Sequence, residues 1–217
     1  MLLAELRAAV AAAGDRLTAA GLVPGTSGNV SAREGDLVAA TPSGLRCGGL
    51  RSEQVTVIDL DGNVVDGELL PTSEMPLHLA VYRATDAGAV AHAHAATSTA
   101  VSCTCDELPA HHYGVVALGG EPRVAAYATF GSAELAANAV DALEGGRRAA
   151  LMQNHGSLAV GRDLAEACDR LELLEWLCEV HLRVVQLGGG RTLSSAQLDA
   201  VRLQLGSDRY GQWRPSA

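Results

Sequence analysis

The periodicity of hydrophobic and polar positions changes along the chain at clusters of glycine and proline. An Ala- and Leu-rich stretch with charges along one side predicts a helix over residues 2–20, closed by Gly21 in a left-handed cap. A short helix rich in Ala, Thr and Ser is expected soon after residue 94. Apolar residues recur at helical spacing in four further stretches, residues 75–86, 132–143, 163–187 and 194–205.

Short apolar runs bounded by turn residues predict the strands. Two hairpins are expected, one across Glu34-Gly35-Asp36 and one across Asp61-Gly62-Asn63. Such turns favour antiparallel pairing, so we expect an α/β fold, a three-layer α/β/α arrangement around a central, mainly antiparallel sheet, with residues 1–217 as a single domain. The predicted strands are residues 30–33, 37–40, 55–60, 64–65, the run around residue 92, 115–118, 123–127, and one strand on each side of residue 155.

Composition and charge exclude several classes of function. The chain has 217 residues, of which 48% are hydrophobic, so it can bury one substantial core. Its formal charge of -9 and its scattered arginines argue against a nucleic-acid binder. No stretch is apolar for long enough to span a bilayer, and the first residues lack the pattern of a signal peptide. We therefore expect a cytoplasmic protein with a small-molecule ligand and no membrane partner.

All sixteen basic residues are arginines, so the chain has no lysine. A Schiff-base aldolase, a pyridoxal-phosphate enzyme and a Walker-A nucleotide site each need a lysine, and all three are excluded. The five cysteines are odd in number, show no paired spacing and are expected to be reduced thiols. Cys103 and Cys105 are expected to be small buried hydrophobes rather than metal ligands, and Cys168 and Cys178 lie in a helical pattern typical of core.

His92 and His94 are separated by one alanine in an apolar run. On a strand, this spacing points both imidazoles to the same side. His155 lies in a second short apolar run, and Glu74 stands at the start of a predicted helix. Three imidazoles and one carboxylate are a tetrahedral donor set that suits Zn²⁺. Such a metal either polarises a carbonyl group or activates water, so carbanion chemistry and hydrolysis both remain open at this point.

Two glycine-bearing loops and one dipeptide could hold a phosphate. The loops are Gly25–Asn29 and Thr41–Gly44, and the dipeptide is Thr72-Ser73. They offer hydroxyl groups, an amide and closely spaced backbone N–H groups, which can bind an anion without a lysine. Each loop taken alone is more typical of an ordinary turn.

Five motifs, G-T-S-G-N-V-S, T-P-S-G, P-T-S-E, H-A-H and N-H-G, follow one another between about residues 5 and 205. In this order they resemble the class II aldolase/adducin family, and within it the L-fuculose-1-phosphate aldolases. The resemblance implies a zinc-dependent aldolase that cleaves a ketose 1-phosphate, L-fuculose 1-phosphate or a related 5-deoxypentulose 1-phosphate. The implied products are dihydroxyacetone phosphate and a small aldehyde, formed reversibly through a metal-stabilised enediolate. A homotetramer with active sites at subunit interfaces is also implied.

The resemblance also assigns roles by position. It implies that His92, His94 and His155 bind the zinc ion, and that Glu74 is the acid/base and also a ligand of the resting metal. Glu74 moves the proton on carbon in the implied mechanism. The implied phosphate-binding residues are Thr26, Gly28, Asn29, Ser43, Gly44, Thr72 and Ser73.

Three aromatic residues are implied at the aldehyde end of the substrate. Tyr113 resembles a tyrosine that reaches the aldehyde oxygen from a neighbouring subunit. Phe130 and Tyr210 resemble positions that line the aldehyde pocket. Tyr210 belongs to a C-terminal tail, residues 206–217, that is expected to cover the active site.

Other activities of the same family remain alternatives. A sugar-phosphate 4-epimerase uses the same cleavage but typically has an aspartate at the position of Glu74, which favours the aldolase. A methylthioribulose-1-phosphate dehydratase would use the same metal and glutamate. An adducin-like interaction module would be expected to lose metal ligands, and this chain keeps them all. The remaining histidines are expected to be packing or surface residues, namely His78, His111, His112 and His181.

Overall fold

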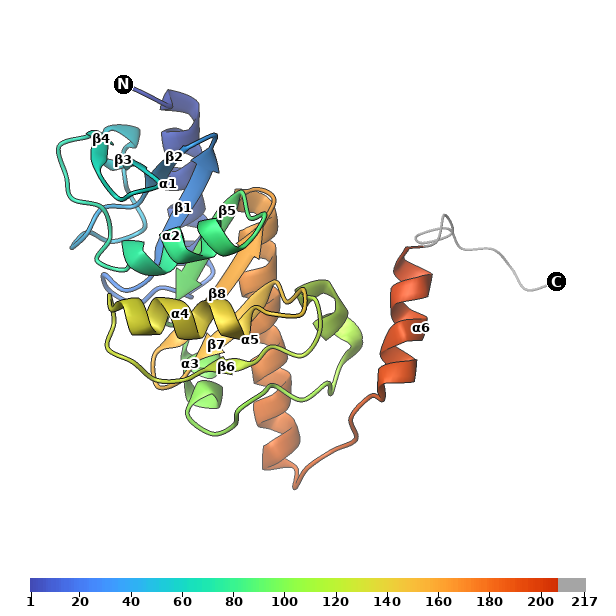
Figure 1. Cartoon of the computed structure of the whole chain (residues 1–217). Coiled ribbons are helices and arrows are strands. Elements are labelled where there is room, and N and C mark those ends of the chain that lie inside the picture. Colours follow the sequence, from blue (N-terminus) through green and yellow to red (C-terminus); the bar gives the residue numbers. More distant parts are fainter. Residues whose placement is uncertain (207–217) are drawn as a thin grey trace.

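One mixed sheet of eight strands forms the middle layer of the protein (Figure 1). The computed structural model describes residues 1–206, so the predicted tail, with Tyr210, lies outside the described residues except for Gly206. The strands are β1 (Asn29–Glu34), β2 (Leu37–Ala40), β3 (Thr56–Asp59), β4 (Val64–Asp66), β5 (Ala89–Ala93), β6 (Val124–Ala125), β7 (Ala149–Met152) and β8 (Gly156–Gly161). Their order is β4-β3-β2-β1-β5-β8-β7-β6, and every neighbouring pair is antiparallel except β6 and β7.

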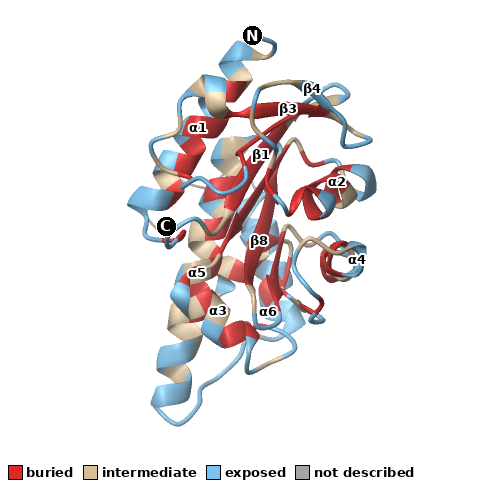
Figure 2. Cartoon of the chain, turned by 90° about the vertical axis from the view of Figure 1, so that its left-hand side faces the viewer, coloured by how far each residue is buried: buried red, intermediate tan, exposed pale blue. Residues whose placement is uncertain are grey.

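Helices cover both faces of the sheet, which confirms the predicted fold class. The helices are α1 (Ala4–Ala19), α2 (Met75–Ala84), α3 (Ala96–Ser102), α4 (Ala133–Ala142), α5 (Leu164–Gln186) and α6 (Ser195–Leu205), with short 3-10 helices η1 (Ser52–Gln54) and η2 (Tyr113–Leu118). Helices α2 and α4 lie on one face, and α1, α3 and α5 lie on the other (Figure 2). Within residues 1–206, no helix is both long and apolar enough to cross a membrane.

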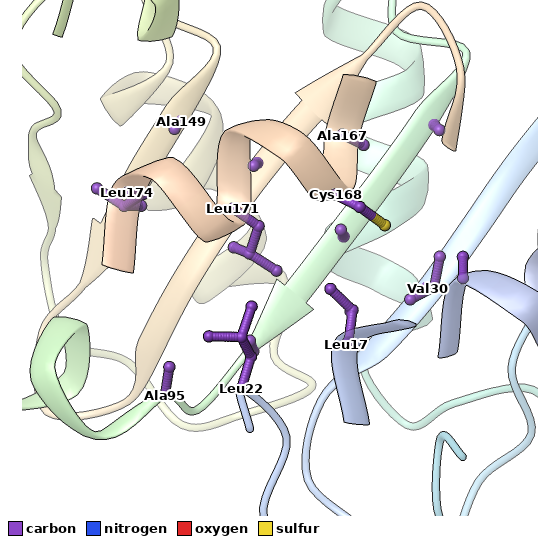
Figure 3. Packing of buried hydrophobic residues seen from close by; sticks show 14 of the residues in the cluster. Leu17, Leu22, Val30, Ala95, Ala149, Ala167, Cys168, Leu171 and Leu174 are labelled. Atoms are coloured by element: carbon purple, nitrogen blue, oxygen red, sulfur yellow. The ribbon is translucent and has the colours of Figure 1, made fainter. Parts of the chain in front are cut away.

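The alternation of strand side chains divides the buried residues into two cores. In β5, Ala89, Ala91 and Ala93 face the core under α1 and α5, whereas Val90 faces the core under α2 and α4. The alanines leave room for the long helix α5, whose Leu171 packs with Leu17 of α1 and Leu22 over the sheet (Figure 3). The buried Cys168 and Cys178 belong to this core, as predicted.

Side-chain caps fix several helix starts close to their predicted positions. Ser132, Asp163 and Ser194 each accept a hydrogen bond from a backbone N–H in the first turn of α4, α5 and α6. Gly21 follows α1 with a φ of 74°, the left-handed conformation expected of it.

Two predictions of local structure are wrong. Residues 115–118, expected as a strand, belong to η2, where the buried Val115 and Leu118 are three residues apart, the period of a 3-10 helix. Cys103, expected to be buried, is exposed at the end of α3, whereas Cys105 is half-buried and packs against the edge of the core. The strand expected at residues 123–127 is shorter than predicted and contains Val124 and Ala125.

Candidate active site

Four chain segments bring chemically reactive side chains together at one end of the central strands. Strand β1 begins at Asn29, and its antiparallel neighbour β5 ends at Ala93, so His92 lies opposite Asn29 and His94 follows directly. The turn between β7 and β8 carries His155, and α2 begins directly after Glu74. The sheet topology therefore gathers residues that are distant in the sequence.

Glu74, His92, His94 and His155 form a metal-binding group. Each offers one ligand atom, and these atoms all lie within 4.8 Å of one another. The Nε2 atom of His92 lies 2.9 Å from Nε2 of His94 and 3.0 Å from Oε2 of Glu74. The Nε2 atom of His155 lies 3.1 Å from Oε1 of Glu74. The predicted H-x-H pair, the third histidine and the carboxylate thus meet at one point.

The hydrogen bonding of these groups fits a bound cation. His92 Nδ1 lies 2.9 Å from the carbonyl oxygen of Ser157, and because a carbonyl only accepts, Nδ1 carries the proton. The lone pair of His92 Nε2 is then directed at His94 and Glu74. Within residues 1–206, the buried Oε1 of Glu74 has no hydrogen-bond partner outside the metal-binding group. Converging lone pairs of three imidazoles and a carboxylate are the donor set of a divalent cation such as zinc.

The electrostatics favour the metal-binding forms of Glu74 and His94. For His92, burial is outweighed by the Glu74 carboxylate, which raises the pKa of that imidazole, so a cation would displace its proton. Burial opposes ionisation of Glu74, but His92, His155 and Asn29 outweigh it and hold the pKa of the carboxyl well below its usual value. Burial, together with the charges that His92 and His155 can carry, lowers the pKa of His94 to about 4. The site therefore presents an ionised carboxylate and a neutral imidazole at neutral pH.

A cavity of about 360 Å³ opens beside the metal ligands. All seven predicted phosphate-binding residues line it, together with Glu74, His94 and His155, while His92 is fully buried. Five further lining residues were not assigned to the site from the sequence: Ser27 and Pro42, which lie inside the predicted loops, and Tyr127, Ala128 and Asn154, which lie outside them. The predicted anion-binding loops and the metal ligands thus share one space.

The backbone around Gly28 explains why glycine occupies this position. Its φ is 79°, and a Cβ atom there would lie 2.4 Å from Cγ1 of Val23 and 2.9 Å from the carbonyl oxygen of His92. The loop therefore packs directly against the strand that carries the metal ligand. The next residue, Asn29, donates its amide N–H to Oε2 of Glu74 at 2.8 Å. This amide supports the carboxylate, a contact that the sequence did not reveal.

The predicted aromatic residues of the aldehyde pocket differ in position. Phe130 lines the cavity with 66% of its surface exposed. Tyr113 stands at the start of η2, 52% exposed and stacked on His112, and does not line this cavity among the described residues. Tyr210 is outside the described residues.

Tyr127 and Asn154 were missed for different reasons. Tyr127 lies at the end of the predicted strand 123–127 and is in fact 60% exposed after β6 has ended. Asn154 adopts a φ of 55° in the turn before His155, a conformation that asparagine tolerates better than most residues. Its amide donates to the sulfur of Cys103 at 3.2 Å. The surface position of Cys103, also mispredicted, places it beside the cavity-lining turn.

Fold and site together define an α/β protein with a metal-binding group beside an open cavity. Residues 8–182 match the family described as Class II Aldolase and Adducin N-terminal domain, and the chain belongs to this family. This confirms the family predicted from the motifs.

Proteins similar in sequence or structure are named as aldolases. The chain is 39% identical to a 5-methylthioribulose-1-phosphate/5-deoxyribulose-1-phosphate aldolase of Rhodospirillum rubrum, covering 90% of this chain and 89% of the relative. It is 34% identical to a 5-deoxy-D-ribulose 1-phosphate aldolase of Bacillus thuringiensis, covering 98% of this chain and 100% of the relative. A solved structure of an L-fuculose 1-phosphate aldolase superposes with a TM-score of 0.88 at 35% identity, covering 93% of this chain and 96% of the other.

Proposed function

We propose that the protein is a metal-dependent aldolase that cleaves a ketose 1-phosphate reversibly into dihydroxyacetone phosphate and a small aldehyde. The observation that carries this proposal is the shared cavity, in which the Glu74 and histidine donors face loops rich in hydroxyl and N–H groups. The aldolase names of the relatives from R. rubrum and B. thuringiensis support it. The chain lacks lysine, so carbonyl activation through a Schiff base is excluded.

Zinc is the proposed cofactor, one ion per subunit. His92, His94 and His155 would hold it, with Glu74 as a further ligand when no substrate is bound. This donor set is typical of zinc sites. So is the buried hydrogen bond by which His92 Nδ1 donates to the Ser157 carbonyl oxygen and orients the imidazole. A bound divalent cation supplies an electrophile that stabilises negative charge developing on the substrate oxygens.

Glu74 is the proposed acid/base. In cleavage, the bond between C3 and C4 breaks, the C4 hydroxyl loses its proton as the aldehyde forms, and Glu74 returns a proton to C3. In condensation, the Glu74 carboxylate removes that proton. The ionised carboxylate of Glu74 is the form that can accept this proton. We propose that Tyr113 of a neighbouring subunit exchanges the proton of the aldehyde oxygen.

The proposed phosphate site needs no cationic side chain. Ser43 and Ser73 expose their hydroxyl groups on the cavity wall, and neighbouring N–H groups can donate to the same anion. The full set proposed to bind the phosphate end is Thr26, Gly28, Asn29, Ser43, Gly44, Thr72 and Ser73.

The aldehyde end of the cavity suits a terminally deoxygenated substrate. Tyr127 and Phe130 present exposed aromatic surface there, which favours an apolar methyl terminus over a hydroxyl group. We propose that Tyr210 contributes from the tail 206–217. A 5-deoxypentulose 1-phosphate, which releases acetaldehyde, and L-fuculose 1-phosphate, which releases lactaldehyde, both have such a terminus.

The proposed assembly is a homotetramer with the active sites at its interfaces. Tyr113 does not line the cavity of its own described chain, which supports a site completed by a second subunit. The proposal treats residues 1–217 as one functional domain. The five cysteines are all unpaired, which supports an enzyme of the reducing cytoplasm.

Product analysis tests the proposed reaction and separates it from its alternatives. Purified enzyme is incubated with the 1-phosphates of L-fuculose, L-rhamnulose, 5-deoxyribulose and methylthioribulose, and dihydroxyacetone phosphate is detected with a coupled NADH-dependent reductase. Release of this product with an equimolar aldehyde supports the aldolase. Loss of water from methylthioribulose 1-phosphate would instead identify a dehydratase, and a C4 epimer without free aldehyde would identify an epimerase.

A further inference from the structure

A row of buried polar side chains lies behind Glu74, between strand β1 and helix α2. Glu74, His78 and Tyr82 are spaced four residues apart, so they share one side of α2. Asn29 and Ser31 are two residues apart on β1 and face that side. All five residues are buried, and the surrounding core of Ile58, Leu77 and Val81 is apolar.

A continuous series of hydrogen bonds joins these side chains. Tyr82 and Ser31 lie 2.7 Å apart through their hydroxyl oxygens, and Ser31 Oγ lies 2.7 Å from His78 Nδ1. His78 Nε2 lies 2.5 Å from Asn29 Oδ1, and Asn29 Nδ2 lies 2.8 Å from Glu74 Oε2.

The Glu74 carboxylate stands at one end of this series and can only accept hydrogen bonds. It therefore sets the donor and acceptor of every hydrogen bond in the series. Glu74 cannot donate when ionised, so the Asn29 NH₂ group must face it, and Asn29 Oδ1 must face His78. His78 Nε2 therefore carries the proton, and its Nδ1 accepts from the Ser31 hydroxyl. The single Ser31 proton is then used, so Tyr82 donates to Ser31. All four donors point towards Glu74.

We propose that His78 is a positioning residue of the aldolase reaction: as the Nε2–H tautomer it holds the Asn29 amide against Oε2 of Glu74 and so fixes the orientation of the catalytic carboxylate. The proposal rests on the proposed function, because it assumes that Glu74 moves the proton on carbon. His78 itself does not line the cavity and acts only through Asn29.

Two features of the surroundings support this role. His78 has no solvent exposure, and both of its ring nitrogens are held, Nε2 by Asn29 and Nδ1 by Ser31, so the ring cannot turn freely. Asn29 Nδ2 is the only hydrogen-bond donor to the Glu74 carboxylate that comes from outside the metal-binding group within residues 1–206. A charge-assisted bond of this kind is strong and directional. Without it, the carboxylate could rotate between the metal ligands and the substrate.

Variants of His78 test the positioning role. His78→Leu removes the donor, and His78→Gln retains an amide donor at about the position of Nε2. With metal content equal to wild type, His78→Leu is expected to lower kcat by about 10²-fold, as geometric misplacement does, with KM changed by less than about threefold. His78→Gln should restore kcat to within about tenfold of wild type. Val81→Ala, on the same helix and equally buried, controls for a loss of packing.

A partial reaction reports directly on Glu74. Wild-type enzyme with dihydroxyacetone phosphate in D₂O, without aldehyde, should exchange one C3 hydrogen for deuterium, and His78→Leu should exchange it about 10²-fold more slowly. In an Asn29→Ala background, the same His78 substitution should cause no further loss, because both residues act through one bond. Two-bond ¹H–¹⁵N spectra should show His78 as the Nε2–H tautomer.

The outcomes separate the two proposals. If wild-type enzyme neither exchanges the C3 hydrogen nor releases dihydroxyacetone phosphate, the proposed function fails. If wild type does both and folded His78→Leu and His78→Gln exchange at the wild-type rate, the positioning role is overturned while the aldolase stands. Additive effects of the Asn29 and His78 substitutions, or a Nδ1–H tautomer, would also overturn it. Should His78→Leu not fold, the single variant Ser31→Ala, which removes the hydroxyl group that fixes His78 Nδ1, decides the same question: a lowered kcat supports the positioning role, and a wild-type kcat overturns it.

Discussion

Asn29 and His92 lie directly opposite each other on the antiparallel strands β1 and β5. Side chains of opposed residues point to the same face, here the face covered by α2, which begins next to Glu74. A slip of one residue by either strand would turn the side chain of that strand to the α5 face and separate Asn29 from His92. The register of two central strands, rather than a flexible loop, therefore fixes the carboxylate support relative to the buried metal ligand.

Removal of one imidazole should abolish metal binding and activity together. His94→Ala leaves three donors and a gap in the site, so metal affinity should fall by more than about 10²-fold, beyond the loss seen when a supporting contact is removed. Metal analysis after gel filtration and the dihydroxyacetone phosphate assay measure the two effects. His111→Ala, outside the cavity, should retain metal. A fully active, metal-free His94→Ala protein would contradict the metal mechanism.

Glu74→Gln should separate metal binding from proton transfer. The three imidazoles still hold the metal, but the amide cannot accept a proton, so kcat should fall by about 10²- to 10⁴-fold. Metal content and deuterium exchange into dihydroxyacetone phosphate are measured on the same preparation. Glu179→Gln, in an exposed ion pair on α5, provides the matched control. Wild-type turnover with glutamine at position 74 would make Glu74 a purely structural residue.

The sequence revealed the parts of the site that have short-range signatures. His92 lies on β5 and His94 just after it, separated by one residue. The motifs that carry Ser43 and Ser73 place glycine or hydroxyl residues within four consecutive positions. One long-range feature, the hydrogen bond between His78 and Asn29, had no such signature. His78 was expected to be a packing or surface residue because the motif pattern gave it no metal role, and its partner Asn29 is 49 residues away in the chain. Its polar neighbours became visible only when β1 and α2 were placed together.

Loss of a cavity hydroxyl should weaken binding of the phosphate end. Ser43 and Ser73 are exposed on the cavity wall and belong to different loops, so single Ser→Ala substitutions should each raise KM for a ketose 1-phosphate about tenfold, the effect of about 1.4 kcal/mol. The value of kcat should change less. Inhibition by inorganic phosphate should weaken in parallel. Unchanged KM and unchanged inhibition in both variants would place the phosphate elsewhere.

Gly28→Ala should disturb both stability and metal binding. The left-handed backbone costs about 1–2 kcal/mol for alanine, and the clash with Val23 and the His92 carbonyl adds about 1–3 kcal/mol. Gly35→Ala is the matched control, since Gly35 has a φ of 60° with nothing within 4 Å of an added Cβ. Urea unfolding and metal titration measure the difference. Equal losses of stability in the two variants would show that the clash is relieved without cost.

Buried thiols should make the protein less stable at alkaline pH. Burial raises the pKa of Cys47 and of Cys168 from 9.0 to about 11. Below the unfolded pKa both states hold the proton, so the contribution to stability is fully present. As the pH rises from 9.0 towards about 11, the unfolded chain releases the proton first and the free energy of unfolding falls by about 1.4 kcal/mol per pH unit for each thiol.

The lysine-free composition makes this effect measurable, because thiols and phenols are then the main side chains that titrate in this range. Urea unfolding of wild type, Cys47→Ala and Cys168→Ala is compared at about pH 8 and about pH 10. Each variant should lose less stability than wild type across this interval. The Cys47 thiol also donates to the carbonyl oxygen of Gly28 at 3.2 Å, so its ionisation removes a contact to the loop behind the metal site. Because the folded Cys47 thiol has a pKa of about 11, metal retention in wild type should hold across this interval and decline only as the pH approaches about 11. An unchanged pH slope of stability in both variants would contradict the assignment of the thiols.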